Sequence, residues 1–424
     1  MLGVFFQKVT LVFKDETLRN RVFFILGALV LFRVLATIPI PGVNVLRLEE
    51  FFANNQFLGM LNIFSGGGLS NLSIVMLGVG PFITAAIIMQ LMTVLSPKIK
   101  AMYQEEGEAG RIKFTQWSRY LTVPLAFMQG FAFLTLLQQN GIVPDLTFVT
   151  MMTNVVIIAA GSILLMWIGE LVTEFGIGNG VSLIIFAGIV ASLPTALSQL
   201  LFTFDVSQAP LYIGFLIAAV AVVAGVVFIA EAERPIPVTY ARQTRGSRQQ
   251  GGVSTYLPLR VNQAGVIPII FALSILLFPQ VVASFFANST IPFVASAANA
   301  VMNGLADNLI YGVLYFIMVF FFTYFYTAMT FDPNRIADNL QKSGAFIPGV
   351  RPGGHTSEHI GNILTRITLV GALFLGTIAV LPIVMQEITG IATLTIGGTA
   401  LLIAVSVVLD IVKRIEAQIS IREY

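Results

Sequence analysis

The sequence predicts an all-α membrane protein with ten transmembrane helices in two pseudo-symmetric, inverted five-helix halves. Three observations predict this fold class: the composition, a set of long apolar segments and a one-sided distribution of basic residues. The 424 residues are 56% hydrophobic and only 10% charged, and their mean hydropathy is +0.88. Soluble domains carry about 25% charged residues, so this chain lacks the polar surface that a protein in water needs.

Ten segments are apolar and long enough to cross a membrane as helices. A helix rises about 1.5 Å per residue, so about 20 apolar residues span the hydrocarbon layer. An even number of spans places both termini on one side of the membrane. In chain order the segments are Val22–Pro41, Ile74–Leu95, Tyr120–Gln138, Met151–Gly169, Val181–Leu201, Leu211–Ala230, Ala264–Phe286, Leu309–Met329, Ile367–Met385 and Ile391–Leu409.

The basic residues gather on the side that holds both termini. Of the 23 Lys and Arg residues, 21 lie in the N-terminal segment, the loops after spans two, six and eight, and the C-terminal tail. Only Arg33, within span one, and Arg47, in an outer loop, lie elsewhere. Because cytoplasmic loops of membrane proteins are enriched in Lys and Arg, both termini are predicted to be cytoplasmic.

The spans divide the chain into two halves, residues 22–202 and residues 203–410, with five spans each. Five is an odd number, so the second half enters the membrane in the opposite direction. Inverted repeats of this kind commonly form a path at the interface of the two halves. The halves are preceded by residues 1–21, a cytoplasmic segment in which Leu2–Phe13 is typical of an interfacial helix, and followed by the tail 411–424.

Two long basic loops, residues 231–261 and 330–365, are predicted on the cytoplasmic side. Scattered charges of this kind can simply rest on lipid headgroups. Two large basic loops on one face favour an additional role in docking a partner, on electrostatic grounds.

The stretch Asn62–Ser73, before span two, is too short and too polar to cross the membrane. Its three consecutive glycines, Gly66–Gly68, favour mobility. Non-helical backbone at membrane depth must line a cavity or be buried in protein. The stretch is therefore either a re-entrant plug or part of an outer loop, and the local sequence does not decide between the two.

Charged and polar groups within the spans are few. Deep carboxylates or histidines would indicate coupling to protons or ions, and the spans contain essentially none. Arg33 is the one clearly embedded charge, and we expect it to snorkel or to pair with loop carbonyls. Gln90 in span two and Asn262 before span seven fit either ordinary interhelical hydrogen bonds or a weak helix contact that separates.

Catalytic and metal-binding motifs are not evident. The chain has no cysteine and two histidines, and it has no phosphate-binding loop of the GxxxxGK[ST] type. His355 and His359 would suit a metal if they were helical, but the surrounding glycines favour a solvated loop. We expect no catalytic residue, no metal and no cofactor, so the energy for any transport comes from elsewhere.

Several blocks of the sequence resemble the bacterial SecY family. They occur in register over nearly the whole chain, which makes the resemblance specific. The blocks are Ile38–Gly42, Asn62–Leu69, Glu105–Arg111, Gly176–Gly180, Ser182–Ile189, Ala264–Pro268, Ala337–Leu340 and Ser343–Gly353.

The resemblance implies a central pore between the two halves, sealed at its waist by a ring of apolar side chains and blocked from outside by a short re-entrant plug helix. A lateral gate would lie between spans two and three on one side and seven and eight on the other. The matching positions are Val79, Ile83, Ile185, Ile270 and Ile403 for the ring, Asn62, Ile63, Phe64, Ser65, Gly66, Gly67, Gly68 and Leu69 for the plug, and Gln90 and Asn262 for the polar contact of the gate.

The resemblance also implies a function, partners and a location. Members of the family conduct unfolded secretory polypeptides across the bacterial plasma membrane and release apolar segments sideways into lipid. The implied partners are the SecE and SecG subunits, the SecA ATPase, the ribosome and preproteins that carry a signal sequence. SecA and the ribosome would dock on loops that contain Arg242, Arg245, Arg248 and Arg351.

This sequence departs from the family pattern at a few positions. Val79 stands where isoleucine is common in the ring, a loss of about one methylene. Pro235 stands where the family often has a basic residue, and the paired arginines around Arg248 are missing.

Three other classes of protein compete with the channel. A secondary transporter would need a site for a small substrate and an ionisable coupling residue at the midplane, and the spans offer none. A membrane-embedded enzyme would need paired acidic residues or a His–Glu cluster within a span. A structural scaffold is compatible with the composition but leaves the plug-like stretch unexplained.

Overall fold

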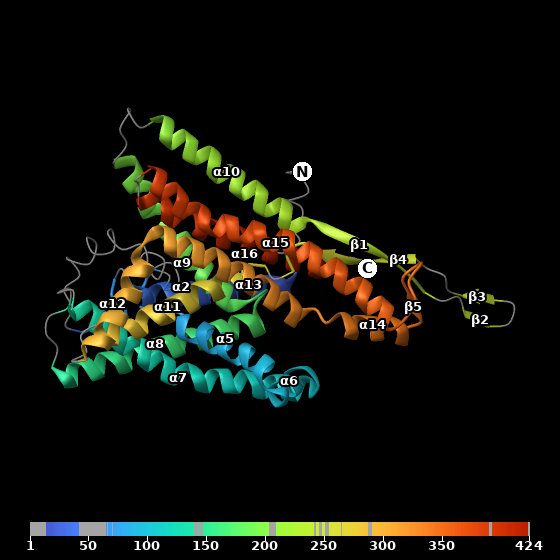
Figure 1. The fold of residues 1–424 in the computed structure, drawn as a ribbon, viewed down its shortest axis with the longest axis horizontal. Coiled ribbons are helices and arrows are strands. Elements are labelled where there is room, and N and C mark those ends of the chain that lie inside the picture. Colours follow the sequence, from blue (N-terminus) through green and yellow to red (C-terminus); the bar gives the residue numbers. More distant parts are fainter. Residues whose placement is uncertain are drawn as a thin grey trace.

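The computed structural model consists of long helices that run roughly along one axis, with a small sheet projecting from one end (Figure 1). It describes residues 14–41, 65, 67–69, 71–139, 143, 147–202, 209–240, 243–245, 248–250, 254–263, 265–286, 291–389 and 392–422. The helices are α2 Glu16–Thr37, α5 Gly80–Leu95, α6 Pro97–Gln104, α7 Gly107–Gln139, α8 Phe148–Phe175, α9 Gly180–Phe202, α10 Ala209–Glu231, α11 Ile267–Phe286, α12 Pro292–Ala306, α13 Asn308–Thr330, α14 Pro333–Lys342, α15 Gly354–Thr389 and α16 Ala392–Arg422.

Each of the ten predicted spans coincides with one helix over most of its length. Within the described residues, five helices are long and apolar enough to cross a membrane, and the pair α5 and α6, bent by 111°, would be a sixth. Three further apolar helices are shorter within the part of the chain that the structure describes, namely Gly180–Pro194, Ala219–Glu231 and Ile267–Gln280. The five long helices are Glu16–Thr37, Gly107–Gln138, Phe148–Phe175, Asn308–Lys342 and Gly354–Met385.

The predicted start of span two at Ile74 is wrong. Residues 71–79 form turns, and α5 begins only at Gly80. Gly78 has φ +57° and Pro81 stands in the first turn of α5. Proline is well accommodated at that position because the first helical amides need no partner within the helix. The backbone before it is therefore free to turn.

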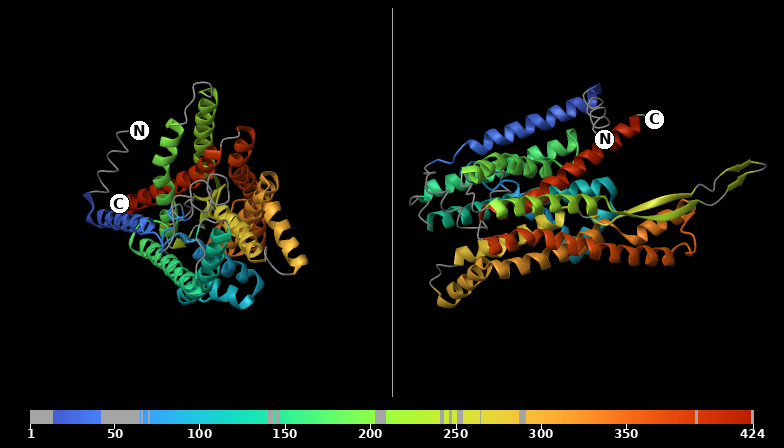
Figure 2. Two further views of the ribbon diagram at one scale, coloured as in Figure 1. Left: turned by 90° about the vertical axis from the view of Figure 1, so that its left-hand side faces the viewer. Right: turned by 90° about the horizontal axis from the view of Figure 1, so that it is seen from above.

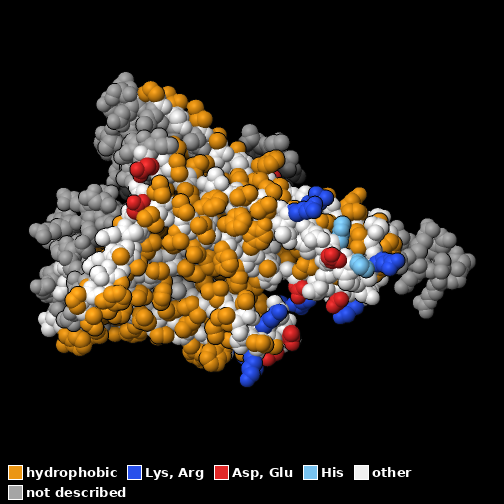
Figure 3. Space-filling model, in the orientation of Figure 1, with side chains coloured by type: hydrophobic (Ala, Val, Ile, Leu, Met, Phe, Trp, Pro, Cys, Tyr) orange, Lys and Arg blue, Asp and Glu red, His pale blue; other side chains and the backbone are white. Residues whose placement is uncertain are grey.

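Apolar side chains cover most of the visible face, whereas Lys and Arg gather at one end (Figure 3). This end carries α6, α14 and the sheet, and it is called the basic end below. Large apolar groups such as Trp167 (59% exposed) and Phe321 (55% exposed) lie on the outer surface. An apolar belt of this extent fits lipid. Helix α2 begins, and α16 ends, at the basic end (Figure 2), as an even number of spans requires.

The two long basic loops fold together instead of remaining irregular. Strands β1 (Glu233–Tyr240) and β4 (Ser254–Arg260) pair antiparallel, and β5 (Ala345–Phe346) from the second loop adds to β1. Short strands β2 (Gln243–Arg245) and β3 (Arg248–Gln250) pair beyond them. Buried apolar side chains hold this basic-end unit together: Ile236, Val238, Leu259, Ala345, Ile347, Ile360 and Leu364.

The largest buried apolar cluster lies in the helix bundle and joins both halves of the chain. It includes Phe32 of α2, Leu165 of α8, Tyr315 of α13 and Leu375 of α15. A smaller cluster packs Leu69, Leu72 and Met76 against residues of α7 and α8. The turns before α5 are thereby buried in protein.

Gly161 of α8 allows this burial. A Cβ placed on Gly161 would collide with the carbonyl oxygen of Ile74 and would also crowd Val75. The main chain of the turns thus lies directly against the backbone of α8. Gly27 of α2 has open space around it instead, with nothing within 4 Å.

We predict that Gly161→Ala destabilises the protein and that Gly27→Ala does not. The added methyl group at position 161 forces the turns away from α8, and overpacking of this kind costs about 1–3 kcal/mol. Thermal unfolding of the detergent-solubilised protein measures the difference. Equal midpoints for the two variants would contradict the close contact.

Candidate functional site

The five predicted ring residues come together in the central apolar cluster. Val79, Ile83, Ile185, Ile270 and Ile403 are all buried, and all belong to the same contiguous set of side chains. They lie on or at the start of α5, α9, α11 and α16, so both halves of the chain contribute. These are the ring positions that the family resemblance implies, and all five are buried in one cluster.

Local sequence explains how these side chains reach the centre. Val79 is the residue that precedes α5, and Ile83, one helical turn later, lies on the same face. Ile270 lies in the first turns of α11, which follows a turn at Gly265 with φ +62°. Branched apolar side chains from four helices therefore belong to one buried cluster. Such a group of side chains repels water and ions.

The re-entrant segment, defined here as residues 65–79, lies beside the end of α2. Ile40 donates its backbone N–H to the Leu72 carbonyl at 2.8 Å, and Ile74 donates to the Ile38 carbonyl at 2.9 Å. Asn71 Nδ2 donates to the Ala36 carbonyl at 3.3 Å. These bonds satisfy backbone groups that lipid could not satisfy.

The structure favours a re-entrant segment over an outer loop. The plug residues Ser65 and Leu69 are buried, at 1% and 0% exposure, and Leu69 donates its N–H to Ser65 Oγ at 3.0 Å. Where the segment is described it consists of turns, with no helix, so a plug helix is not seen over Ser65, Gly67, Gly68 and Leu69. The predicted plug residues Asn62, Ile63, Phe64 and Gly66 lie outside the described residues.

The predicted lateral gate corresponds to a direct contact between helices of the two halves. Helices α5 and α7 both contact α11, and Thr93 Oγ1 of α5 lies 3.9 Å from Met329 Sδ of α13. Gln90 Oε1 and Asn262 Oδ1 are buried without a hydrogen-bond partner, so no hydrogen bond joins them here. Asn262 Nδ2 instead donates to the Gly265 carbonyl at 3.2 Å.

Unpartnered buried amide groups make this contact weak. A buried polar atom without a partner costs about 1–3 kcal/mol. Packing the helices together along a seam that contains such atoms therefore releases less free energy than packing along an apolar seam of the same area.

The predicted docking arginines lie at or beyond the basic-end unit. Arg351 is exposed in a turn between Gly349 and Gly353, which have φ +83° and +96°. Its carbonyl accepts a hydrogen bond from Thr356 Oγ1 at 2.8 Å, which fixes the turn to the start of α15. Arg245 and Arg248 are opposite each other where β2 pairs with β3. Arg242 lies outside the described residues.

The interpretation of the His355–His359 segment as a loop is wrong. Helix α15 begins at Gly354, so the two histidines lie one helical turn apart on its first turns. Both are exposed. Within the described residues no group of three His, Cys, Asp or Glu side chains could hold a metal ion.

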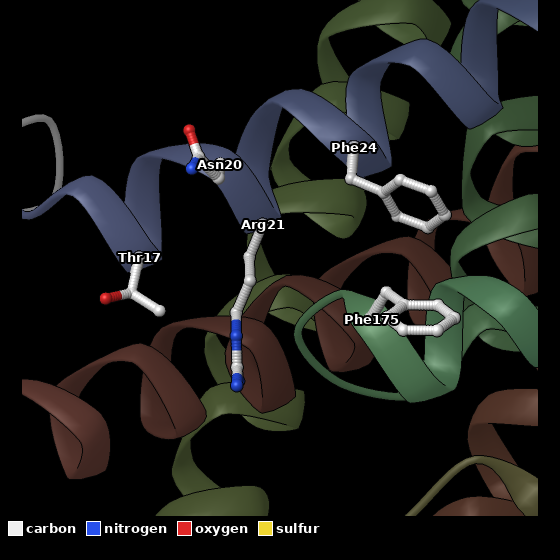
Figure 4. A pocket seen from close by; sticks show the side chains of 5 residues that line it. All are labelled: Thr17, Asn20, Arg21, Phe24 and Phe175. Atoms are coloured by element: carbon white, nitrogen blue, oxygen red, sulfur yellow. The ribbon is translucent and has the colours of Figure 1, made fainter.

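A shallow groove of about 460 Å³ lies at the start of α2, at the basic end (Figure 4). It is lined by Thr17, Asn20, Arg21, Phe24 and Phe175. The rings of Phe24 and Phe175 meet edge to face, with centroids 5.9 Å apart. Aromatic rings beside a guanidinium are typical of the boundary between water and lipid. The groove shares no residue with the central cluster.

The fold and the central cluster define a polytopic helical membrane protein with an apolar core that both halves share. A solved structure of a protein-conducting channel has the same fold, with a TM-score of 0.66 and 20% identity over 94% of this chain and 92% of that chain. Sec61 in the canine ribosome–channel complex from the endoplasmic reticulum gives a TM-score of 0.63 at 19% identity, with the same coverage.

Sequence relatives define the family more closely. The SecY family model matches residues 73–412. The protein translocase subunit SecY of Streptomyces scabiei is 41% identical over 430 residues, which cover 97% of each chain. The SecY subunit of Mycobacterium tuberculosis is 39% identical over 452 residues, 100% of this chain and 99% of the relative. This chain belongs to the SecY family, and it is a multi-pass membrane protein.

The basic-end sheet is the feature that sequence reasoning missed. In β1, buried Ile236 and Val238 alternate with exposed residues, and alternation with this period is a strand signal. The signal is short and contains Pro235 and Pro237, which usually argue against a strand. Its partner β5 lies about a hundred residues later in the chain, so the pairing has no local signature.

We predict that Ile236→Asp unfolds the basic-end unit while the helix bundle stays intact. Ile236 is 3% exposed, and a carboxylate buried there without a partner is strongly unfavourable. Trypsin should then cleave at Arg260 much faster than in the parent protein, which peptide masses would show. Tyr256→Asp, at a position that is 66% exposed on β4, is the matched control and should be cleaved at the parent rate. Equal rates for both variants would refute the packed unit.

Proposed function

We propose that this chain is the channel-forming subunit of a bacterial Sec translocon. It passes unfolded secretory polypeptides across the plasma membrane and releases apolar segments sideways into lipid. The observation that carries the proposal is the central apolar cluster, in which the five ring residues of a SecY-family chain are buried between two halves.

The apolar ring acts as a seal that a polymer can cross. Water leaves a narrow apolar constriction, so ions meet a barrier even where the walls do not touch. Branched side chains change rotamers without breaking a hydrogen bond, so they yield to a passing chain and close around it. Val79 is both the last residue of the re-entrant segment and one of the five ring residues. The segment therefore lies beside the ring.

The gate supplies the sideways exit. Helices α5 and α7 would separate from α11 and α13 along the seam that contains Gln90 and Asn262. An apolar segment in the pore would then meet lipid and partition into it by the hydrophobic effect. The unpartnered amide atoms in the seam support this assignment.

The chain does no catalysis of its own in this proposal, and its partners supply the energy. SecA or the ribosome would dock at the basic-end unit and the β2–β3 pair, where Arg245, Arg248 and Arg351 lie. SecE and SecG would complete the complex within the membrane, and preproteins with a signal sequence are the substrates. The termini and the basic end face the cytoplasm, which agrees with the distribution of basic residues.

We predict that replacing Ile83, Ile185 and Ile270 together by glycine makes resting channels leak ions. Removal of three branched side chains widens the constriction and lets water wet it. Single-channel conductance of the purified complex in planar bilayers is the measurement. As a control, glycine at Ile213, Leu216 and Ile217, which are 59–64% exposed on α10, should leave the resting conductance at the parent level. A triple ring variant that conducts no more than the parent would refute the ring.

We predict that Arg351→Glu abolishes SecA-driven export in reconstituted vesicles while the protein stays folded. The charge reversal places a carboxylate where a partner's acidic groups would otherwise meet a guanidinium, and like charges repel. Protease protection of a precursor measures export. Arg335→Glu, an exposed change on α14 of the same end, should keep most of the export. Normal export by Arg351→Glu would remove the docking assignment.

A further inference from the structure

Arg33 is a charged side chain within an apolar helix. Its neighbours Leu31 and Val34 are 49% and 53% exposed on the lipid-facing side of α2, whereas Phe32 is fully buried. Arg33 itself is half-buried. Arginine within a membrane span is costly, and such residues usually pair with carboxylates or with backbone carbonyls. The position therefore calls for a specific partner.

The guanidinium of Arg33 lies against the re-entrant segment. A Cβ built on Gly67 would be 3.6 Å from Arg33 Nη1. Gly67 has φ +81°, a conformation that suits glycine, and it has no side chain to keep the guanidinium away from the main chain. Arg33 thus reaches the backbone of this turn directly.

Two different contacts hold the re-entrant segment to α2. Its base is tied to residues 36–40 by the hydrogen bonds of Asn71, Leu72 and Ile74 described above. Its tip, at Gly67, meets α2 at Arg33, about one helical turn before Ala36. The base is fixed by neutral backbone bonds, whereas the contact at the tip involves a charge.

We propose that Arg33 is the latch of the plug: its guanidinium donates hydrogen bonds to carbonyl oxygens of the turn around Gly67 and holds the tip of the re-entrant segment in place. This inference rests on the proposed function, in which the segment closes the pore. Arg33 is a positioning residue, since it touches the segment and not the translocating polypeptide.

The chemistry of arginine suits a latch. The guanidinium offers five donors in a planar fork. Hydrogen bonds from a charged donor are about twice as strong as neutral ones. One side chain can therefore bond to several carbonyl oxygens of the turn.

The absence of cysteine from the chain allows a direct test. A single cysteine at Leu69, at the tip, is fully buried, and one at Met76, at the base, is equally buried. With the complete channel complex in membrane vesicles, a membrane-impermeant maleimide applied from the outer side reports how often each position becomes accessible. Labelling does not depend on protein transport, so it tests the role of Arg33 even if the chain does not export polypeptides.

Arg33→Gln should increase the labelling rate of Leu69→Cys about tenfold or more, the effect of losing one charge-assisted hydrogen bond. Arg33→Lys should give an intermediate rate because a single ammonium keeps the charge and loses the fork. Labelling of Met76→Cys should stay at the parent rate in both variants. Arg21→Gln, which removes a charge from the basic end of the same helix, is the matched control and should change neither rate.

Two results would overturn the proposal. An unchanged labelling rate at position 69 in Arg33→Gln would mean that Arg33 only snorkels toward water. An equal increase at positions 69 and 76 would mean that Arg33 supports the whole segment and does not act at its tip. A parallel measurement of resting ion conductance tests whether the latch contributes to the seal. Faster labelling at position 69 without any ion leak would mean that Arg33 holds the segment but that this contact does not seal the pore.

Discussion

Backbone groups at membrane depth must find their partners within the protein, and the centre of this molecule depends on that constraint. The turns at residues 71–79 interrupt the helical order in the middle of the bundle. They remain possible because the end of α2 offers a short strand-like edge at Ile38–Ile40 and because Gly161 lets them lie against α8. These turns set where α5 begins, and α5 in turn places Val79 and Ile83 among the side chains of the other half.

The cluster at the centre and the seam beside it have opposite chemistry. The five ring positions carry branched apolar side chains, which have no hydrogen-bonding group to satisfy. The seam keeps buried amide atoms of Gln90 and Asn262 without partners, so its closure is less favourable. In the proposed channel, the ring holds back water while the neighbouring seam separates at moderate cost.

The sequence was sufficient for the helical spans, and the family resemblance named five ring residues that the structure buries in one cluster. Apolar length identifies the spans because the thickness of the lipid layer sets a minimum helix length. Other features depend on contacts between distant segments. Ile74 is apolar enough for a helix, and its packing on Gly161 and its hydrogen bond to Ile38 place it in a turn. The pairing of Thr239 with Phe346 and the helical setting of His355 likewise need the folded chain.

The pairing of β1 with β4 and β5 has a mechanical consequence. Helix α10 runs into β1 almost without a break, Val261 after β4 leads to α11, and β5 precedes α15 by a few residues. The carbonyl of Val261 also lies so close to Gly371 of α15 that a Cβ there would be 2.7 Å away. A force applied to this sheet is thus transmitted to three helices, α10, α11 and α15. A ligand that binds the β1–β4–β5 sheet therefore restrains the adjoining ends of α10, α11 and α15 together.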